Sequence, residues 1–432
     1  MIFTLEPLKA AEGDCLLLHF GTPQAPRLAL IDGGPGQIWE TSLLPRLQQI
    51  AANRNVQQLE IELAMLSHVD NDHAVGLKKL FRRLKSEVED HIPVPQRLLR
   101  VKRLWHNTFN DVLGDSIDKY YRTLTATLQA STGGGAPNPA LEEALARAHR
   151  DEHGGSAEEA AEIASDVALV MAGHGEGRDI RDSHEVLRAN NEIAALNAPF
   201  LKHNRPALIT TGNAPNAVDV AGLSFRILGP MQEEIEALQK AFDKYVQDKG
   251  LTAEAMLAAY SDKSVPNLSS IVCIVEAGGK RILLTGDARG DKIITGLEKA
   301  GLLVNGKFAV DVLKVPHHGS DRNTTAEFFA KIRAKHYVLS GDGKHGNPER
   351  DTVGWLIDSR KPTDRYTIVL TYPLAVIDAE RRREVLKKHK PWVPAQHALA
   401  DLIAARKAQG HKFKLVEGAP FKIDLGGDKV TW

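Results

Sequence analysis

The segment 67–76, with the sequence SHVDNDHAVG, is crowded with histidine and aspartate. Its potential metal ligands are His68, Asp70, Asp72 and His73. Imidazoles and carboxylates packed this closely repel and desolvate one another unless cations lie between them. A tight loop turns alternate side chains to one side, so we expect these ligands to face a common metal site. The alternative is a solvated acidic turn in which Asp72 caps the following helix.

Similar residues directly follow apolar runs elsewhere in the chain, namely Asp32, Asp287 and the pair His317-His318. In α/β folds, the loops beyond the carboxyl ends of strands converge on one crevice. We therefore expect Asp287 and the histidine pair to reach the same site as the segment 67–76. Their arrival later in the chain favours metal binding over a simple acidic turn.

Five short motifs occur in an order that resembles the metallo-β-lactamase-fold hydrolases. They are GDC at 13–15, IDGG at 31–34, SHVDNDH at 67–73, TGD at 285–287 and PHHGS at 316–320. Within that superfamily, the chain is most similar to the soluble hydrolase domain of ComEC-type DNA-internalisation proteins. The segments NLSS at 267–270 and HGNP at 345–348 carry this closer similarity. The resemblance implies a four-layer αβ/βα metallo-β-lactamase-like sandwich.

The resemblance also implies two divalent metal ions. By position, His68 and Asp70 correspond to ligands of a first ion, and Asp72 and His73 to ligands of a second. Asp287 corresponds to the carboxylate that bridges the two ions. These assignments are expectations that come from the family pattern.

The remaining site positions stay open at the level of the sequence. Either His317 or His345 would complete the second metal site. His106 and Asn267 are the candidates for the third ligand of the first ion, and an ordinary loop histidine is the alternative for His106. Ser320 is a candidate substrate contact if it begins a helix that faces an anion, and a plain helix cap is the alternative.

Asp70 departs from the family pattern, which usually has a histidine at this position. An oxygen ligand shifts the preference of the site toward Mn²⁺ or Mg²⁺, although Zn²⁺ keeps the higher raw affinity. The identity of the metal is therefore open, and we expect Zn²⁺ or Mn²⁺.

The expected chemistry is hydrolysis by a metal-activated hydroxide. Two cations about 3.5–4 Å apart lower the pKa of a bridging water and clamp both the attacking and the leaving oxygen of a phosphodiester. We expect Asp72 to orient the hydroxide. His318 is expected to stabilise the transition state or to protonate the leaving oxygen, which contributes about 10²–10⁴-fold. Which of His317 and His318 coordinates the metal is not assigned by the sequence.

The function predicted from these features is a phosphodiesterase, most specifically a nuclease with nucleic acid as its substrate. Basic clusters at 82–85, 97–103 and 381–390 support this prediction, although each is also typical of a solvated helix face. One alternative is a hydrolase of a lactone, thioester or β-lactam carbonyl. A second alternative is a non-catalytic metal-binding interaction protein.

The elements that would position these residues follow from the hydrophobic pattern. Short apolar runs within 1–31, separated by Gly-Asp turns, predict hairpins, and apolar spacing predicts helices at 41–53 and 76–84. We predict a first half of the sandwich at 1–107, a helical insertion at 108–206, a second half at 207–358 with a helical excursion at 232–260, and a C-terminal extension at 359–432.

The composition is that of an ordinary globular protein. The chain has 432 residues, 43% of them hydrophobic, and its 55 Lys+Arg balance 55 Asp+Glu. The two cysteines form no metal-binding or disulfide pattern. No secretory signal and no uncharged apolar stretch of about 18 residues is found. We therefore expect a cytoplasmic protein without a membrane partner. A homo-oligomer or a protein partner bound through the helical insertions stays open.

Overall fold

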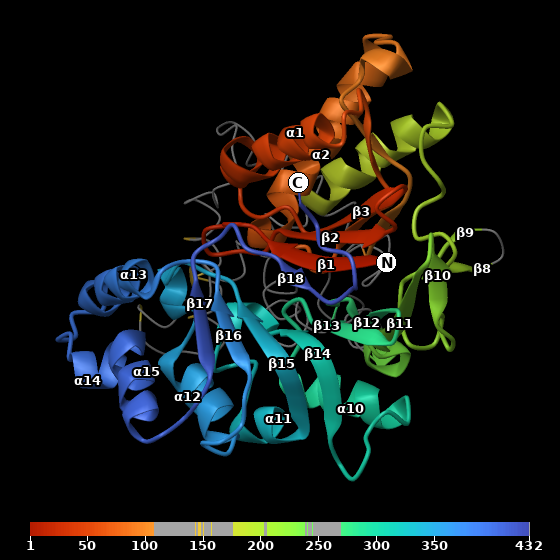
Figure 1. Cartoon of the computed structure of the whole chain (residues 1–432). Coiled ribbons are helices and arrows are strands. Elements are labelled where there is room, and N and C mark those ends of the chain that lie inside the picture. Colours follow the sequence, from red (N-terminus) through yellow and green to blue (C-terminus); the bar gives the residue numbers. More distant parts are fainter. Residues whose placement is uncertain are drawn as a thin grey trace.

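A computed structural model describes residues 1–107, 176–202, 205–237 and 269–431, together with isolated positions between 143 and 157 and at 240 and 244. Two β-sheets lie face to face, with helices on their outer sides (Figure 1). Most of the predicted insertion at 108–206, most of the excursion at 232–260, and Asn267 lie outside the described residues.

The first sheet has six strands and is built from both ends of the chain. Its order is β18 (Ile423–Asp424), β1 (Ile2–Pro7), β2 (Leu16–Gly21), β3 (Pro26–Ile31), β5 (Leu63–Leu66) and β7 (Leu104–His106). The strands from β18 to β3 are antiparallel, as the predicted hairpins require, whereas β3, β5 and β7 are parallel.

The second sheet has eight strands that follow the chain order. They are β10 (Val218–Val220), β11 (Leu223–Gly229), β12 (Val272–Ala277), β13 (Lys280–Leu284), β14 (Phe308–Lys314), β15 (Ile332–Leu339), β16 (Thr367–Leu370) and β17 (Lys414–Glu417). Pairing is antiparallel from β10 to β13 and parallel from β13 to β17. The parallel strands of both sheets therefore direct their carboxyl ends toward loops that can share one site.

The hydrophobic core has three parts that define four layers. The inner faces of the two sheets pack together through buried side chains such as Phe3, Trp105 and Phe225. The outer face of the six-stranded sheet is covered by α1 (Leu44–Asn53), α2 (Asn71–Glu89) and the helical residues 176–189. The outer face of the eight-stranded sheet is covered by α10 (Gly290–Lys299), α11 (Ala326–Lys331), α12 (Arg350–Asp358), α13 (Leu374–Lys387) and α15 (Leu399–Ala408). The predicted αβ/βα sandwich is confirmed.

Smaller elements connect these layers. They are β4 (Leu59–Ile61) paired with β6 (Leu99–Val101), β8 (Leu201–Lys202) paired with β9 (Arg205–Pro206), α14 (Pro394–His397), a π-helical turn at Trp39–Leu43 and 3-10 turns at Val94–Gln96, Pro316–Gly319 and Lys344–Gly346. Within the described ranges, no helix combines the length and apolarity that crossing a membrane would require.

The segment 359–432, predicted as an extension, contributes to both sheets. It supplies β16 and β17 to the eight-stranded sheet, and β18 pairs with β1 so that the two ends of the chain lie together. Figure 1 shows this blue strand beside the red N-terminal strands. The domain boundaries themselves stay a prediction.

Candidate metal centre

The loop after β5 and the first turn of α2 carry the acidic and histidine residues of the segment 67–76. His68 follows the strand, Asp70 is the N-cap of α2, and Asp72 and His73 lie in its first turn. The loop is tied to the end of β3 because Asp32 accepts hydrogen bonds from the Ser67 amide at 2.7 Å and from the Ser67 hydroxyl at 2.6 Å.

Loops of the eight-stranded sheet supply the facing residues. Asp287 follows β13, and His317 and His318 lie in the 3-10 turn after β14. Both histidines have positive φ values, 47° and 54°, which are uncommon for residues other than glycine. This backbone geometry turns the two adjacent rings in different directions, and their planes are 78° apart.

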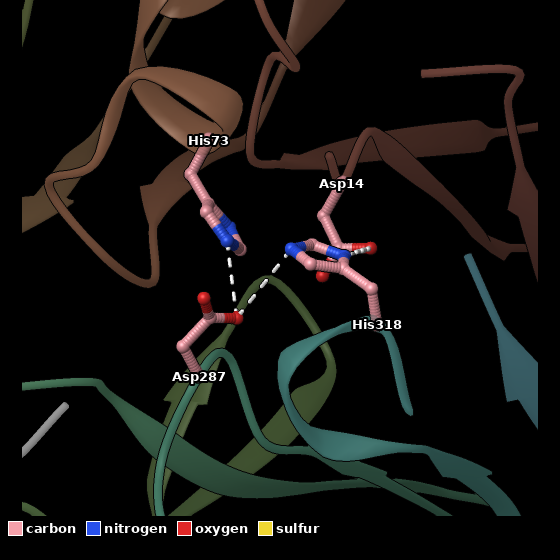
Figure 2. Close-up of side chains that lie close together, drawn as sticks. All are labelled: Asp14, His73, Asp287 and His318. Carbon is pink, nitrogen blue, oxygen red and sulfur yellow. Dashed lines mark ion pairs between the residues drawn. The ribbon is translucent and has the colours of Figure 1, made fainter. Parts of the chain in front are cut away.

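Four side chains from the two sheets meet in the buried region between these loops. Figure 2 shows Asp14 and His73 approaching from the six-stranded sheet, and Asp287 and His318 from the eight-stranded sheet. One ligand atom from each lies within 4.8 Å of the other three. Nε2 of His73 is 3.1 Å from Oδ1 of Asp287, and Nε2 of His318 is 3.8 Å from the same oxygen. We call these four residues the central cluster.

Further ligand-type residues border the central cluster. Oδ2 of Asp72 lies 3.0 Å from Nε2 of His318. Nε2 of His68 is 3.1 Å from Oδ2 of Asp70, and the His68 ring centroid lies 5.6 Å from that of His73. Together these contacts join the whole segment 67–76 to the loops of the opposite sheet.

The second ring nitrogen of each of three histidines is held by a neighbour. Nδ1 of His73 contacts Oδ2 of Asp32 at 3.0 Å, and Nδ1 of His318 contacts Oγ of Ser340 at 3.0 Å. The Ser340 hydroxyl in turn donates to Asp14. Such contacts make Nδ1 a donor and direct Nε2 toward the carboxylates, which is the arrangement typical of metal-binding histidines.

His317 is held in the same way. Its Nδ1 atom lies 2.7 Å from Oδ1 of Asn323. The orientation of that amide is fixed because Asn323 Nδ2 donates to the Asp287 carbonyl at 2.8 Å. Nδ1 of His317 is therefore the donor, and its Nε2 atom faces Oδ2 of Asp287 at 3.6 Å.

Buried polar atoms without hydrogen bonds indicate that a cation fits this site. Nε2 of His68 and of His73 and Oδ1 of Asp70 and of Asp287 are all buried and make no hydrogen bond. Nε2 of His73 and Oδ1 of Asp287 are only 3.1 Å apart, yet they are not aligned as donor and acceptor. Two ligands that each bind zinc at about 2.0–2.2 Å lie at a similar separation from one another. The nitrogen and oxygen donor set suits Zn²⁺ or Mn²⁺.

The electrostatics of the central cluster also call for positive charge. Burial lowers the pKa of His318, but Asp14 and Asp287 outweigh this effect and raise it to about 9. Burial likewise opposes protonation of His73, whose pKa the Asp287 and Asp72 carboxylates nevertheless raise well above its ordinary value. Burial raises the pKa of Asp72, while His73 and His318 together lower it to about 2. The carboxylates thus stay ionised, and a divalent cation bound between them would neutralise their negative charge.

The structure brings most of the predicted residues together. Those that meet at or beside the central cluster are His68, Asp70, Asp72, His73, Asp287, His317 and His318. His318, predicted to be catalytic, lies inside the cluster and is 1% exposed. His317, predicted as a ligand, is 31% exposed and contacts the rim of the cluster.

The other candidate residues are placed differently. His345 is exposed in the 3-10 turn Lys344–Gly346 and is not part of the central cluster. His106 is buried at the end of β7, where its Nε2 atom packs close to Gly177 of the helical residues 176–189. Ser320 begins no helix, because its hydroxyl accepts the Arg322 amide in a turn and α11 starts only at Ala326.

Several residues of the site were not predicted as site residues. Asp14 and Ser340 hold His318, and the buried Lys314 pairs with Asp14 at 2.7 Å. Ser270 accepts the Asp287 amide and lies 3.4 Å from His68 Nδ1. Asp14 lies in the GDC motif and Ser270 in the NLSS motif, so these motifs could have identified both as site residues. Lys314 sits in an apolar strand and gives no such signal.

Comparisons with known proteins find a relative in sequence and similar solved structures. The chain is 32% identical over 120 residues to ComE operon protein 3 of Bacillus subtilis (strain 168), a match that covers 27% of this chain and 14% of that protein. The Zn²⁺-bound PqqB of Methylobacterium extorquens aligns over 98% of this chain and all of its own, with 12% identity and a TM-score of 0.33. No family model matches the chain. The similarity to ComEC-type proteins that the motifs predict is thus supported over part of the sequence.

Proposed function

We propose that this chain is a metal-dependent hydrolase of phosphodiester bonds in nucleic acid. The observation that carries the proposal is the convergence of histidine Nε2 atoms, each with its Nδ1 atom held from behind, on buried carboxylates. A group of ionised acids and imidazoles buried without a cation would be costly. Ligands preorganised in this way bind a divalent ion at a small entropic cost.

The geometry favours a specific distribution of ligands. We assign Asp72, His73, Asp287 and His318 to one divalent ion, because Nε2 of His318 lies 3.0 Å from Oδ2 of Asp72 and Nε2 of His73 lies 3.1 Å from Oδ1 of Asp287. Asp14, the remaining member of the central cluster, is paired with the Lys314 ammonium at 2.7 Å. His68 and Asp70 are then the residues available to a second ion, next to the ring of His73. This assignment retains every ligand of the segment 67–76. It makes His318 the metal ligand and leaves His317 for catalysis, which reverses the roles that the sequence suggested.

Divalent ions bound here would lower the pKa of a coordinated water and polarise a phosphoryl oxygen. The protein itself orients the reactants. Asp72 is 25% exposed and is positioned to hold an attacking water. His317 is the only one of the two adjacent histidines with substantial exposure, so we assign it the proton transfer to the leaving oxygen. A general acid of this kind contributes about 10²–10⁴-fold.

The acid-rich ligand set supports a phosphodiester over a carbonyl substrate. Carboxylate ligands suit hard cations such as Mn²⁺ and Mg²⁺, which are the usual ions of phosphoryl-transfer sites. The sequence resemblance to ComEC-type hydrolase domains points to the same substrate class. Hydrolysis of a lactone, thioester or β-lactam is the alternative that an assay has to separate.

The test compares wild type with Asp287→Asn and with the matched control Asp291→Asn, which changes an exposed acid on α10. Substrates are a labelled linear DNA and bis(p-nitrophenyl) phosphate, both with Mn²⁺, alongside a lactone and a thioester. We expect Asp287→Asn to lower kcat/KM for both diesters by at least about 100-fold, and the control to keep full activity. Equal cleavage by wild type and Asp287→Asn would refute the proposal, and turnover of the carbonyl substrates alone would establish the alternative.

A further inference from the structure

A basic cleft lies on the eight-stranded sheet where β16 and β17 begin. Its volume is about 550 Å³, and its lining includes Lys335, His336, Arg365, Thr367, Lys412 and Lys414. These residues come from three stretches of the chain that are adjacent only in the folded sheet. Figure 1 shows β15, β16 and β17 side by side.

The register of the strands gathers the cations of this cleft. His336 pairs with Thr367, and Thr367 pairs with Lys414, so these three residues form a row across β15, β16 and β17. With neighbouring strands about 4.8 Å apart, the row is about 10 Å long. Arg365 and Lys412 each stand two residues before a member of the row, which is the spacing of side chains on one face of an extended chain.

The positive charge of the cleft is mostly uncompensated. Arg365, Lys412 and Lys414 form no ion pair with any acid among the described residues, and all three are exposed. Lys335 pairs with Asp311 at 2.8 Å, but Asp311 also faces Lys280 at 3.8 Å. The cleft therefore presents a cationic surface, and none of its lining residues is acidic.

The surroundings of His336 are also electropositive. Its Nδ1 atom is buried and makes no hydrogen bond. Burial lowers the pKa of His336, and Lys335 and Lys414 lower it further against the opposing effect of Asp311. An anion bound in the cleft would relieve the repulsion among these cations and give the imidazole a partner.

Several residues of the basic clusters that the sequence offered for nucleic acid are paired within the protein. Arg82 pairs with Asp179, and Arg97 pairs with Glu192. In the stretch 381–390, Arg381 is buried and donates to the carbonyls of Gly346 and Pro348. Arg382, Lys388 and Lys390 of the same stretch are exposed and form no ion pair among the described residues, but they do not line this cleft.

We propose that this cleft binds the phosphate backbone of a nucleic-acid strand at a position separate from the metal centre. The inference rests on the proposed function and extends it to the substrate. Ser340, which holds His318, follows His336 by four residues, and this length of strand spans about 13 Å. Tyr337, Val338 and Leu339, which lie between them, are buried, so a nucleic-acid strand would have to pass around the sheet to reach both the cleft and the metal centre. The cleft therefore contributes to long substrates and not to short ones.

The direct test measures binding without catalysis. The anisotropy of a fluorescein-labelled single-stranded 30-mer is followed in EDTA at increasing NaCl concentrations. The variants are Lys412→Glu/Lys414→Glu and the control Lys307→Glu/Lys429→Glu, which makes the same charge change at exposed positions outside the cleft and outside the basic clusters. The cleft variant should bind more weakly at every salt concentration, with a slope of log K against log salt that is shallower by about 1.4.

An equal slope for the cleft variant and the control would overturn the inference. Binding of inorganic phosphate in the cleft without any effect of the cleft variant on the 30-mer would overturn it as well. A second measurement separates this inference from the proposed function. The cleft variant should raise KM for the 30-mer and leave the hydrolysis of bis(p-nitrophenyl) phosphate unchanged. If no diester is cleaved by any form but the slope changes as expected, the proposed function fails and the binding cleft stands.

Discussion

The chemistry of the site depends on the residues that hydrogen-bond to the ligands as much as on the ligands themselves. Asp32 holds His73, and Ser340 together with Asp14 holds His318. Each of these contacts selects one tautomer and one ring orientation, so that Nε2 faces the carboxylates. Residues of this kind typically change metal affinity by 10–100-fold without touching the metal.

Ser340→Ala tests this arrangement. The substitution removes the acceptor for His318 Nδ1 and frees the ring to rotate or to change tautomer. We expect the affinity for Zn²⁺ or Mn²⁺ to fall by about 10–100-fold, measured by calorimetry on the metal-free protein. Ser359→Ala is the control, because Ser359 donates only to the Leu356 carbonyl at a helix end. Unchanged affinity in Ser340→Ala would show that the serine does not position the ligand.

The segment 67–76 could be proposed as a site from the sequence alone because its ligand-type residues are contiguous and flank one helix start. The sequence could not choose between His317 and His318, since that choice depends on positive φ angles and on the partners Asn323 and Ser340. It proposed His345 because a loop motif resembled the family, whereas the fold leaves this side chain exposed. Contacts between distant segments, such as that of Asp14 with His318, are decided only in three dimensions.

At the scale of elements, glycine residues let α2 approach the loops that it must meet. A Cβ atom on Gly76 would lie 2.0 Å from the Gly33 carbonyl oxygen, and one on Gly13 would lie 1.9 Å from the Asp72 carbonyl oxygen. Both obstacles are backbone atoms that no rotamer change could relieve. The position of Asp72 and His73 therefore depends on these close backbone contacts.

Gly76→Ala should push α2 away from the end of β3. We expect a loss of about 1–3 kcal/mol in the free energy of unfolding, as for other overpacked sites, measured by urea denaturation. The matched control is Gly354→Ala in α12, where the nearest atom to the new Cβ is Leu402 Cδ2 at 3.9 Å. That variant should be neutral or more stable by up to about 1 kcal/mol. Equal stability of the two variants would contradict the packing described for α2.

A buried pair between β1 and β2 gives the stability a pH dependence. Glu6 Oε2 lies 2.7 Å from His19 Nε2, and Arg46 of α1 donates to the same carboxylate at 2.6 Å. Burial opposes ionisation of Glu6, but His19 and Arg46 hold its pKa below the ordinary value. Burial lowers the pKa of His19 more than Glu6 raises it.

Both depressed pKa values mean that the unfolded chain binds more protons than the folded chain. The stabilisation is complete above the unfolded pKa of histidine, about 6.5, and is lost progressively as the pH falls. We expect the stability difference between wild type and His19→Gln to shrink between pH 7 and pH 4, measured by urea unfolding in EDTA. A difference that stays constant over this range would contradict the assigned pKa of His19.

At the scale of the whole molecule, the site exists only when the two sheets are packed together. His73 belongs to one sheet and Asp287 and His318 to the other, as Figure 2 shows. Metal binding to the folded chain should therefore stabilise the entire sandwich by mass action. The resemblance of the ordered motifs to a known family implied the sandwich, and the hydrophobic pattern predicted apolar strands bounded by Gly and Asp. It left the contribution of 359–432 unrecognised, since β17 and β18 are short and only partly buried.

The most direct measurement is the metal content of protein purified without chelator, determined by elemental analysis and combined with thermal melting during Zn²⁺ or Mn²⁺ titration. The metal centre described here predicts at least one divalent ion per chain and a rise in Tm when metal is restored to the stripped protein. His73→Ala should lose both. A wild-type protein that holds no divalent ion and gains no thermal stability from either metal would contradict the account.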